Sequence, residues 1–136
     1  MSDDLQQQWK SGGFERLKRA LAHQTSALRQ GLMHDPGIRQ VTIAVAVFTT
    51  VAVLLPVDRL ERLLLVLSLM LVGVMEVLNS AIETCVDRIS TERHPLSGRA
   101  KDYASLAVGG SVLMCAVCWL VIAGPAMWRT LASLLD

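Results

Sequence analysis

The chain contains three long stretches without a charged residue, and these restrict its fold more than any other feature. They cover residues 41–57, 63–75 and 103–128 of the 136-residue sequence. The hydrocarbon core of a bilayer is about 30 Å thick, and a helix needs about 20 mainly apolar residues to cross it. Because only helices and closed barrels satisfy their own backbone in lipid, the sequence predicts an all-α membrane protein. We expect one membrane domain over residues 1–136, with spans at 40–56, 62–90 and 99–124.

The region before the first span shows a different helical pattern. Between residues 12 and 34, apolar residues recur at spacings of three, four or seven, with basic residues between them. This pattern is typical of an amphipathic helix that lies on an anionic membrane surface. The sequence His34-Asp35-Pro36-Gly37 predicts its end. The apolar positions are Phe14, Leu17, Leu21, Leu28 and Leu32, and the basic ones are Arg16, Lys18, Arg19 and Arg29.

The distribution of basic residues predicts the orientation in the membrane. Of the 13 Lys and Arg residues, ten lie before the first span or around the loop between spans two and three, and three lie elsewhere. Because basic residues stay on the cytoplasmic side, we expect the amino terminus in the cytoplasm and the carboxyl terminus outside. The aromatic content of 4% is too low for a protein that stacks nucleic-acid bases, so nucleic acid is not an expected partner.

Four polar residues form one stripe along the second span. They are separated by three, four and four residues, so a helix places them within about 80° of one another. A carboxylate at the centre of a membrane helix costs about 2.5–3.5 kcal/mol on insertion scales, so the stripe predicts a functional site. The alternative is a polar seam that only joins helices, for which Ser, Thr or a single Asn is more usual. The four residues are Glu76, Asn79, Glu83 and Asp87.

The two glutamates of this stripe are too far apart to share an ion. Seven residues separate them, which is about 10.5 Å along a helix, whereas Mg²⁺ lies about 2.1 Å from each oxygen ligand. We expect the deeper Glu76 to act as a general base on the hydroxyl of a membrane-dissolved substrate. Glu83 and Asp87 lie where a hydrated Mg²⁺ and phosphates fit, although the same two acids also suit an ordinary solvated helix end.

Further charges gather around a loop predicted over residues 91–98. Basic side chains there can neutralise phosphate charge, and an acid can hold a basic side chain or a nucleotide hydroxyl. The chain has neither a Walker A sequence nor the glycine-rich loop of protein kinases, so the predicted nucleotide site is not of a standard soluble type. The gathered residues are Arg93, His94, Arg99, Lys101 and Asp102.

Two sequence blocks at this end of the second span resemble a known family. The first is Glu76-Val-Leu-Asn79-Ser-Ala-Ile-Glu83-Thr-Cys-Val-Asp87-Arg-Ile, and the second is His94-Pro-Leu-Ser-Gly-Arg-Ala-Lys101-Asp102. Together they closely resemble the prokaryotic integral-membrane diacylglycerol kinases, and the resemblance extends from about residue 13 to residue 119. It implies a homotrimeric helical bundle that phosphorylates diacylglycerol from Mg·ATP to give phosphatidic acid. The active sites are then expected between subunits, at the cytoplasmic boundary of the membrane.

The resemblance also implies roles for individual residues, position by position. Glu76 is the expected catalytic base, and Asp35 and Glu83 are the expected Mg²⁺ ligands. Asn79 and Ser105 are expected to orient the reacting groups together with Arg16. Asp87 is a secondary candidate for a residue of the same site. The expected nucleotide-binding residues are Arg16, His23, Asp35, Glu83, Glu92, Arg93, His94, Lys101 and Asp102.

The match departs from the family pattern toward the amino terminus. Asp35 stands where the family usually has Glu, His23 stands at a position that usually belongs to an aromatic-bearing pair, and Val41 offers no carboxylate. Asp35 also suits a helix N-cap, because Pro36 follows it at what would be the first helical position.

Two other functions fit parts of the pattern. A related branch of the family phosphorylates undecaprenol, although the element Ser97-Gly98-Arg99 favours diacylglycerol. The stripe could also line an ion or proton path in a membrane protein that is not an enzyme. Such a path needs polar groups through the whole bilayer, whereas residues 63–75 are apolar apart from Ser68. The sequence therefore favours a pocket that reaches half of the membrane depth.

Overall fold

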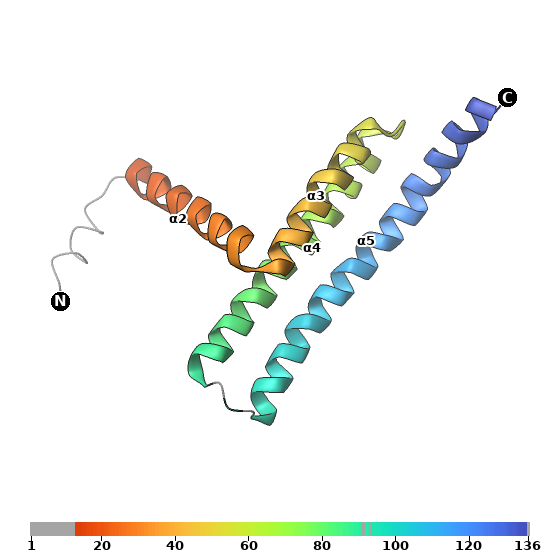
Figure 1. Ribbon diagram of the computed structural model, residues 1–136. Helices are drawn as coiled ribbons and strands as arrows, with labels where there is room; N and C mark the ends of the chain where they lie inside the picture. Colours follow the sequence, from red (N-terminus) through yellow and green to blue (C-terminus); the bar gives the residue numbers. More distant parts are fainter. Residues whose placement is uncertain (1–12, 91, 93, 136) are drawn as a thin grey trace. The chain divides into compact units, whose positions relative to one another are not determined.

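The computed structural model describes residues 13–90, 92 and 94–135, and within these residues the fold is all-α, as predicted. The helices are α2 (Gly13–His34), α3 (Pro36–Leu54), α4 (Arg59–Ile89) and α5 (Pro95–Leu135) (Figure 1). The chain divides after Pro36 into two compact units. The first contains α2, and the second contains α4, α5 and nearly all of α3.

Three of these helices match the three predicted spans. Pro36–Leu54, Arg59–Ile89 and Pro95–Ser133 are each long and apolar enough to cross a membrane by length and composition. Large apolar side chains such as Leu67, Leu106 and Leu120 are more than half exposed, which suits helices whose outer surface is solvated by lipid tails.

The predicted amphipathic helix is confirmed as a helix. α2 has 22 residues, and none of its side chains is buried. Its apolar residues Phe14, Leu17 and Leu21 are 78%, 57% and 52% exposed, so the apolar face is available to a surface outside the chain. That this surface is the membrane stays a prediction.

The turn between α3 and α4 is held by side chains that the sequence places next to it. The Asp58 side chain accepts from Glu61 N at 2.8 Å, and Glu61 Oε2 accepts from Asp58 N at 3.0 Å, which is a capping box. This cap starts α4 at Arg59, earlier than the span predicted from residue 62. The Arg62 guanidinium then reaches back and donates to the carbonyl oxygens of Ala52, Leu55 and Val57.

The third apolar helix is longer than the predicted span. We expected Gly124-Pro125 to end it, but this expectation is wrong, because α5 continues through Pro125 to Leu135. A proline removes one helical hydrogen bond, and helices in apolar surroundings tolerate the loss where neighbouring groups compensate. The bond lost is the one from residue 125 to the carbonyl of Val121. After the proline, the Arg129 side chain donates to Pro125 O at 3.3 Å and Thr130 donates to Ala126 O at 3.0 Å, and the helix continues.

Small residues allow the helices of the second unit to pack closely. α4 and α5 make the most extensive contact between elements, and the buried residues of α5 are Ala104, Ser111, Ala123 and Ala126. Ala123 joins Ala52 of α3 and Leu65 of α4 in one buried cluster. Phe48 of α3 meets Trp119 of α5 edge to face, with the ring centroids 5.1 Å apart. The three helices are therefore held together at this level, and the opposite ends of α4 and α5 carry the polar residues.

Candidate active site

The polar stripe predicted from the sequence lies on a single helix, α4. Glu76 and Asn79 are half-buried, whereas Glu83 and Asp87 are exposed. Asn79 Nδ2 donates to Glu83 Oε1 at 3.2 Å, so two members of the stripe are bonded to each other one turn apart. The other amide atom, Asn79 Oδ1, is buried and has no hydrogen-bond partner among the described residues.

The contact between α3 and α4 shows where the two glutamates lie along the length of α3. A methyl group on Gly73 would lie 3.9 Å from Val45 Cγ2, so these residues are at the same level. At 1.5 Å per residue, Glu76 lies about 4.5 Å beyond Gly73 and Glu83 about 15 Å beyond it. Val45 itself lies about 13.5 Å from Pro36, the first residue of α3. Glu76 is thus within the length of α3, and Glu83 is near the level at which α3 begins.

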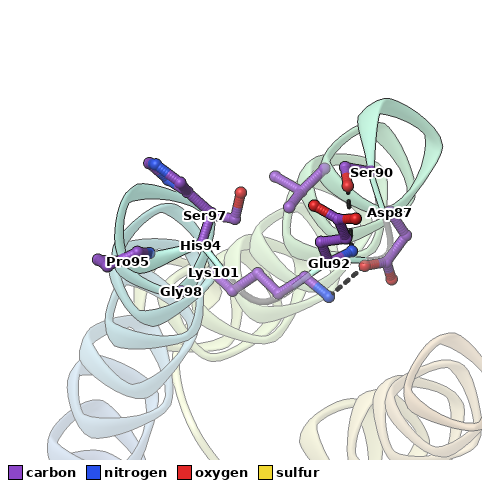
Figure 2. A pocket seen from close by; sticks show the side chains of 9 residues that line it. Asp87, Ser90, Glu92, His94, Pro95, Ser97, Gly98 and Lys101 are labelled. Carbon is purple, nitrogen blue, oxygen red and sulfur yellow. Dashed lines mark hydrogen bonds and ion pairs between the residues drawn. The ribbon is translucent and has the colours of Figure 1, made fainter.

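A cavity lies where α4 ends and α5 begins, next to the exposed end of the stripe. Its volume is about 480 Å³. Figure 2 shows side chains from both helices and from the loop between them around this space. Four candidate residues from the sequence line the cavity. They are Asp87 on α4, Glu92 and His94 in the loop, and Lys101 on α5. The residues that line it are Val86, Asp87, Ser90, Glu92, His94, Pro95, Ser97, Gly98 and Lys101.

An ion pair joins the two helices across this cavity. Lys101 Nζ lies 2.6 Å from Asp87 Oδ1, and Figure 2 shows the two side chains directed toward each other. The Lys101 side chain is 35% exposed and that of Asp87 is 58% exposed. Water and a polyanion can therefore reach both groups. Among the described lining residues, Lys101 thus places an ammonium at the wall of this cavity.

His94 begins α5. Its Nδ1 accepts from Leu96 N at 3.2 Å, and its carbonyl accepts from Gly98 N at 3.1 Å. Pro95 follows at the first helical position, where its missing N–H is no loss. Because Nδ1 is an acceptor in this contact, the proton of a neutral imidazole is on Nε2. That nitrogen is left as a hydrogen-bond donor on a residue that lines the cavity.

Several candidate residues are not among those that line the cavity. Asp102 and Ser105 are exposed on α5 and do not line the cavity. The backbone N–H of Glu92 donates to Ser90 Oγ at 3.0 Å, which fixes the start of the loop. Arg93 lies outside the described residues. Three candidates belong to the amino-terminal unit, with Arg16 and His23 on α2 and the half-buried Asp35 directly after it.

The donor groups fit a Mg²⁺ ion that arrives with a nucleotide. Across the described residues, no group of three or more His, Cys, Asp or Glu side chains is placed to hold a metal ion by itself. Mg²⁺ in kinases is commonly bound by one or two carboxylates, with phosphates and water as its other ligands. The exposed Glu83 carboxylate is a hard oxygen donor of this kind, and the amide of Asn79 holds one of its two oxygens.

Some lining residues were not predicted from the sequence to bind nucleotide or metal. Ser90, Ser97 and Gly98 lie in or next to the two sequence blocks, which was the available signal. The pairing of Asp87 with Lys101 had none, because it depends on how α4 and α5 align across the loop.

Comparison with known proteins identifies the family. The prokaryotic diacylglycerol kinase model matches residues 23–123, which include the stripe and the cavity. Diacylglycerol kinase of Escherichia coli is 41% identical over 110 residues, covering 81% of this chain and 90% of that protein. The enzymes of Pseudomonas aeruginosa and Haemophilus influenzae are 37% and 32% identical over 110 and 111 residues, covering 81% and 82% of this chain and 89% and 94% of theirs. The chain therefore belongs to the prokaryotic diacylglycerol kinase family.

Proposed function

We propose that this protein transfers the γ-phosphate of Mg·ATP to the free hydroxyl of diacylglycerol, giving phosphatidic acid and ADP. The observation that carries the proposal is the family match over residues 23–123, because this range holds the half-buried glutamate of α4 as well as the cavity beside it. The names of the relatives support the same lipid substrate. Three apolar helices support an enzyme that meets its substrate in the membrane.

In the proposed reaction, Glu76 is the general base. The hydroxyl oxygen of diacylglycerol attacks the γ-phosphorus, the bond from that phosphorus to the bridging oxygen breaks, and ADP leaves. The hydroxyl proton passes to the Glu76 carboxylate. Two features support this role: Glu76 lies within the length of α3, and it is only half-buried, so a lipid hydroxyl can approach it.

The nucleotide is proposed to bind at the cavity. Lys101 and the Nε2 proton of His94 supply positive or donor groups for its phosphates, as phosphoryl transfer requires. Glu92, Arg93 and Asp102 are proposed to contact the nucleotide from the loop and the start of α5, and Arg16 and His23 from α2. Asn79 and Ser105 are proposed to orient the reacting groups.

Mg²⁺ is proposed to be held by Glu83 and Asp35 together with the phosphates of ATP. Bound there, it neutralises charge on the phosphate oxygens during transfer. The chain's own contribution is to hold the carboxylate of Glu83, which the amide of Asn79 fixes through one oxygen.

The protein is proposed to be an inner-membrane homotrimer with its amino terminus in the cytoplasm. The distribution of its 13 basic residues supports this orientation, which places the cavity on the side where ATP is found. The polar groups of α4 support the assembly. Glu76 and Asn79 are only half-buried within the described chain, and polar side chains against lipid tails are costly, so another copy of the chain is the natural neighbour for this face.

A direct comparison of lipid substrates tests the proposed function. Purified protein in mixed micelles receives labelled ATP with either dioleoylglycerol or undecaprenol, at equal mole fractions. We expect rapid transfer to dioleoylglycerol and little to undecaprenol. Preferred transfer to undecaprenol would assign the protein to the other branch of lipid kinases. Transfer to neither lipid, from protein that binds ATP, would contradict the proposal.

A further inference from the structure

The charges of Asp87 and Lys101 are not where helix stability favours them. Asp87 lies in the last turn of α4, near the negative end of the helix dipole, where a carboxylate is disfavoured. Lys101 lies in the second turn of α5, on the side of the positive end, where the dipole gives a cation no benefit. The positions of these two residues therefore need a reason other than the stability of their own helices.

The ion pair between them is also a weak source of folding stability. Its members are 35% and 58% exposed, and pairs that remain in water contribute little because solvent screens them. The close distance of 2.6 Å nevertheless fixes the ammonium at one place on the cavity wall. The effect of the pair is thus to position Lys101, rather than to hold the fold together.

Positioning matters for a lysine more than for most residues. Its four-carbon side chain has much rotamer freedom, and that freedom is lost whenever the ammonium is fixed on a ligand. In this structure Asp87 has already restricted it. An ammonium has three N–H donors, and the contact with Asp87 uses one of them. Two donors are left for oxygens of a ligand in the cavity.

We propose that Asp87 is a positioning residue that holds Lys101 in place for the phosphates of the nucleotide. This inference rests on the proposed function, in which Lys101 contacts phosphate. It gives Asp87 a role different from that of a reserve metal ligand, because the contact of Asp87 is with the ammonium across the helix pair. Asp87 does not itself touch the nucleotide and acts through Lys101.

A cycle of four proteins tests the proposal by equilibrium binding of ATP to the full chain in detergent micelles, without lipid substrate. The four are the native protein, Asp87→Asn, Lys101→Met and the double variant. We expect Lys101→Met to weaken ATP binding by about 10-fold to 100-fold, the scale of charged hydrogen bonds. We expect Asp87→Asn to weaken it about threefold to fivefold, and to cause no further loss in the Lys101→Met protein.

Two further variants separate positioning from other effects of charge. Asp87→Glu keeps a carboxylate that can reach the ammonium, so its ATP affinity should stay within about twofold of the native value. Glu61→Gln also removes one acid near an end of α4, but at the other end, and a glutamine still forms the capping box. It should leave ATP binding unchanged. In the kinase assay, Asp87→Asn should raise the KM for ATP without changing the Mg²⁺ concentration needed for half activity.

Several results would overturn the proposal. Equal losses from Asp87→Asn in both backgrounds would mean that Asp87 acts independently of Lys101. Tighter ATP binding in Asp87→Asn would mean that the native carboxylate repels the phosphates. A raised Mg²⁺ requirement in the same variant would mean that Asp87 is a metal ligand. A loss in Asp87→Glu as large as that in Asp87→Asn would also contradict it. Protein that shows the expected cycle but phosphorylates no diacylglycerol would refute the proposed function alone.

Discussion

Asn79 and Glu83, one turn apart on α4, are bonded through the amide nitrogen of the first and one carboxylate oxygen of the second, at 3.2 Å. The bond leaves the amide oxygen of Asn79 buried and without a partner among the described residues. A buried polar atom without a partner is costly, and in native proteins it often marks a place where a ligand, ion or water binds. The arrangement places one such acceptor beside a fixed carboxylate, between the deep and shallow parts of the stripe.

The first prediction concerns this bond. Replacing Asn79 with Ala removes the donor that fixes Glu83 as well as the buried acceptor. We expect turnover to fall by about 10-fold or more, because a hydrogen bond to a charged group is lost. Thr84→Val is a matched control, since the Thr84 hydroxyl bonds only the carbonyl of Ser80 on its own helix at 2.8 Å. Equal activity of the two variants would remove Asn79 from the site.

The second prediction concerns the general base. Glu76→Gln keeps the size of the side chain but cannot accept the proton. We expect turnover to fall by about 100-fold or more, with assembly and ATP binding retained. Initial rates with dioleoylglycerol, together with equilibrium ATP binding, measure the two effects separately. If the variant keeps more than half of the native activity, another group is the base.

The third prediction concerns Asp35 and Glu83 as ligands of one Mg²⁺ ion. Asp35→Asn or Glu83→Gln should each raise the Mg²⁺ concentration needed for half activity. The double variant should be little worse than the worse single variant, because the first loss already breaks the site. Asparagine caps a helix about as well as aspartate. If Asp35 serves only as a cap, the Asp35→Asn protein should therefore keep its activity. An unchanged Mg²⁺ midpoint in Asp35→Asn would leave Glu83 as the ligand and Asp35 as a cap.

The fourth prediction concerns assembly. The polar face of α4 needs neighbours other than lipid, so we expect a homo-oligomer of three chains. Native mass measurement in mild detergent, with chemical crosslinking of membranes as an independent check, should give a trimer. Fully active protein that is only monomeric under both conditions would contradict the expectation.

Much of the fold follows from the sequence because one physical requirement dominates it. A chain with three uncharged stretches of this length must form helices, and the structure has helices over all three. The ends of the helices were less predictable. The capping box of Asp58 and Glu61 was not predicted, and it explains the early start of α4. Pro125 did not end α5, because apolar residues on both sides continue the helix.

The candidate site was predictable only where its residues share one element. The stripe on α4 follows from spacing alone, and α4 confirms it as one helix. The contact of Asp87 with Lys101 joins residues 14 positions apart on two helices, and spacing cannot give the angle or register between them. The roles of Arg16, His23 and Asp35 rest on the family resemblance and stay predictions, since they belong to the separate amino-terminal unit.

The turn between α3 and α4 has a consequence for how the protein enters the membrane. In the proposed orientation this turn must cross the hydrocarbon during insertion, and unpaired charges there are costly. Its charged residues are two acids and two bases, Asp58, Arg59, Glu61 and Arg62, which sum to zero. The capping box joins the two acids to backbone N–H groups, and Arg62 is bonded to three carbonyls of the same hairpin. Three of the four charged side chains of this turn, those of Asp58, Glu61 and Arg62, therefore have polar partners within the hairpin itself, which lowers the cost of carrying them through the membrane.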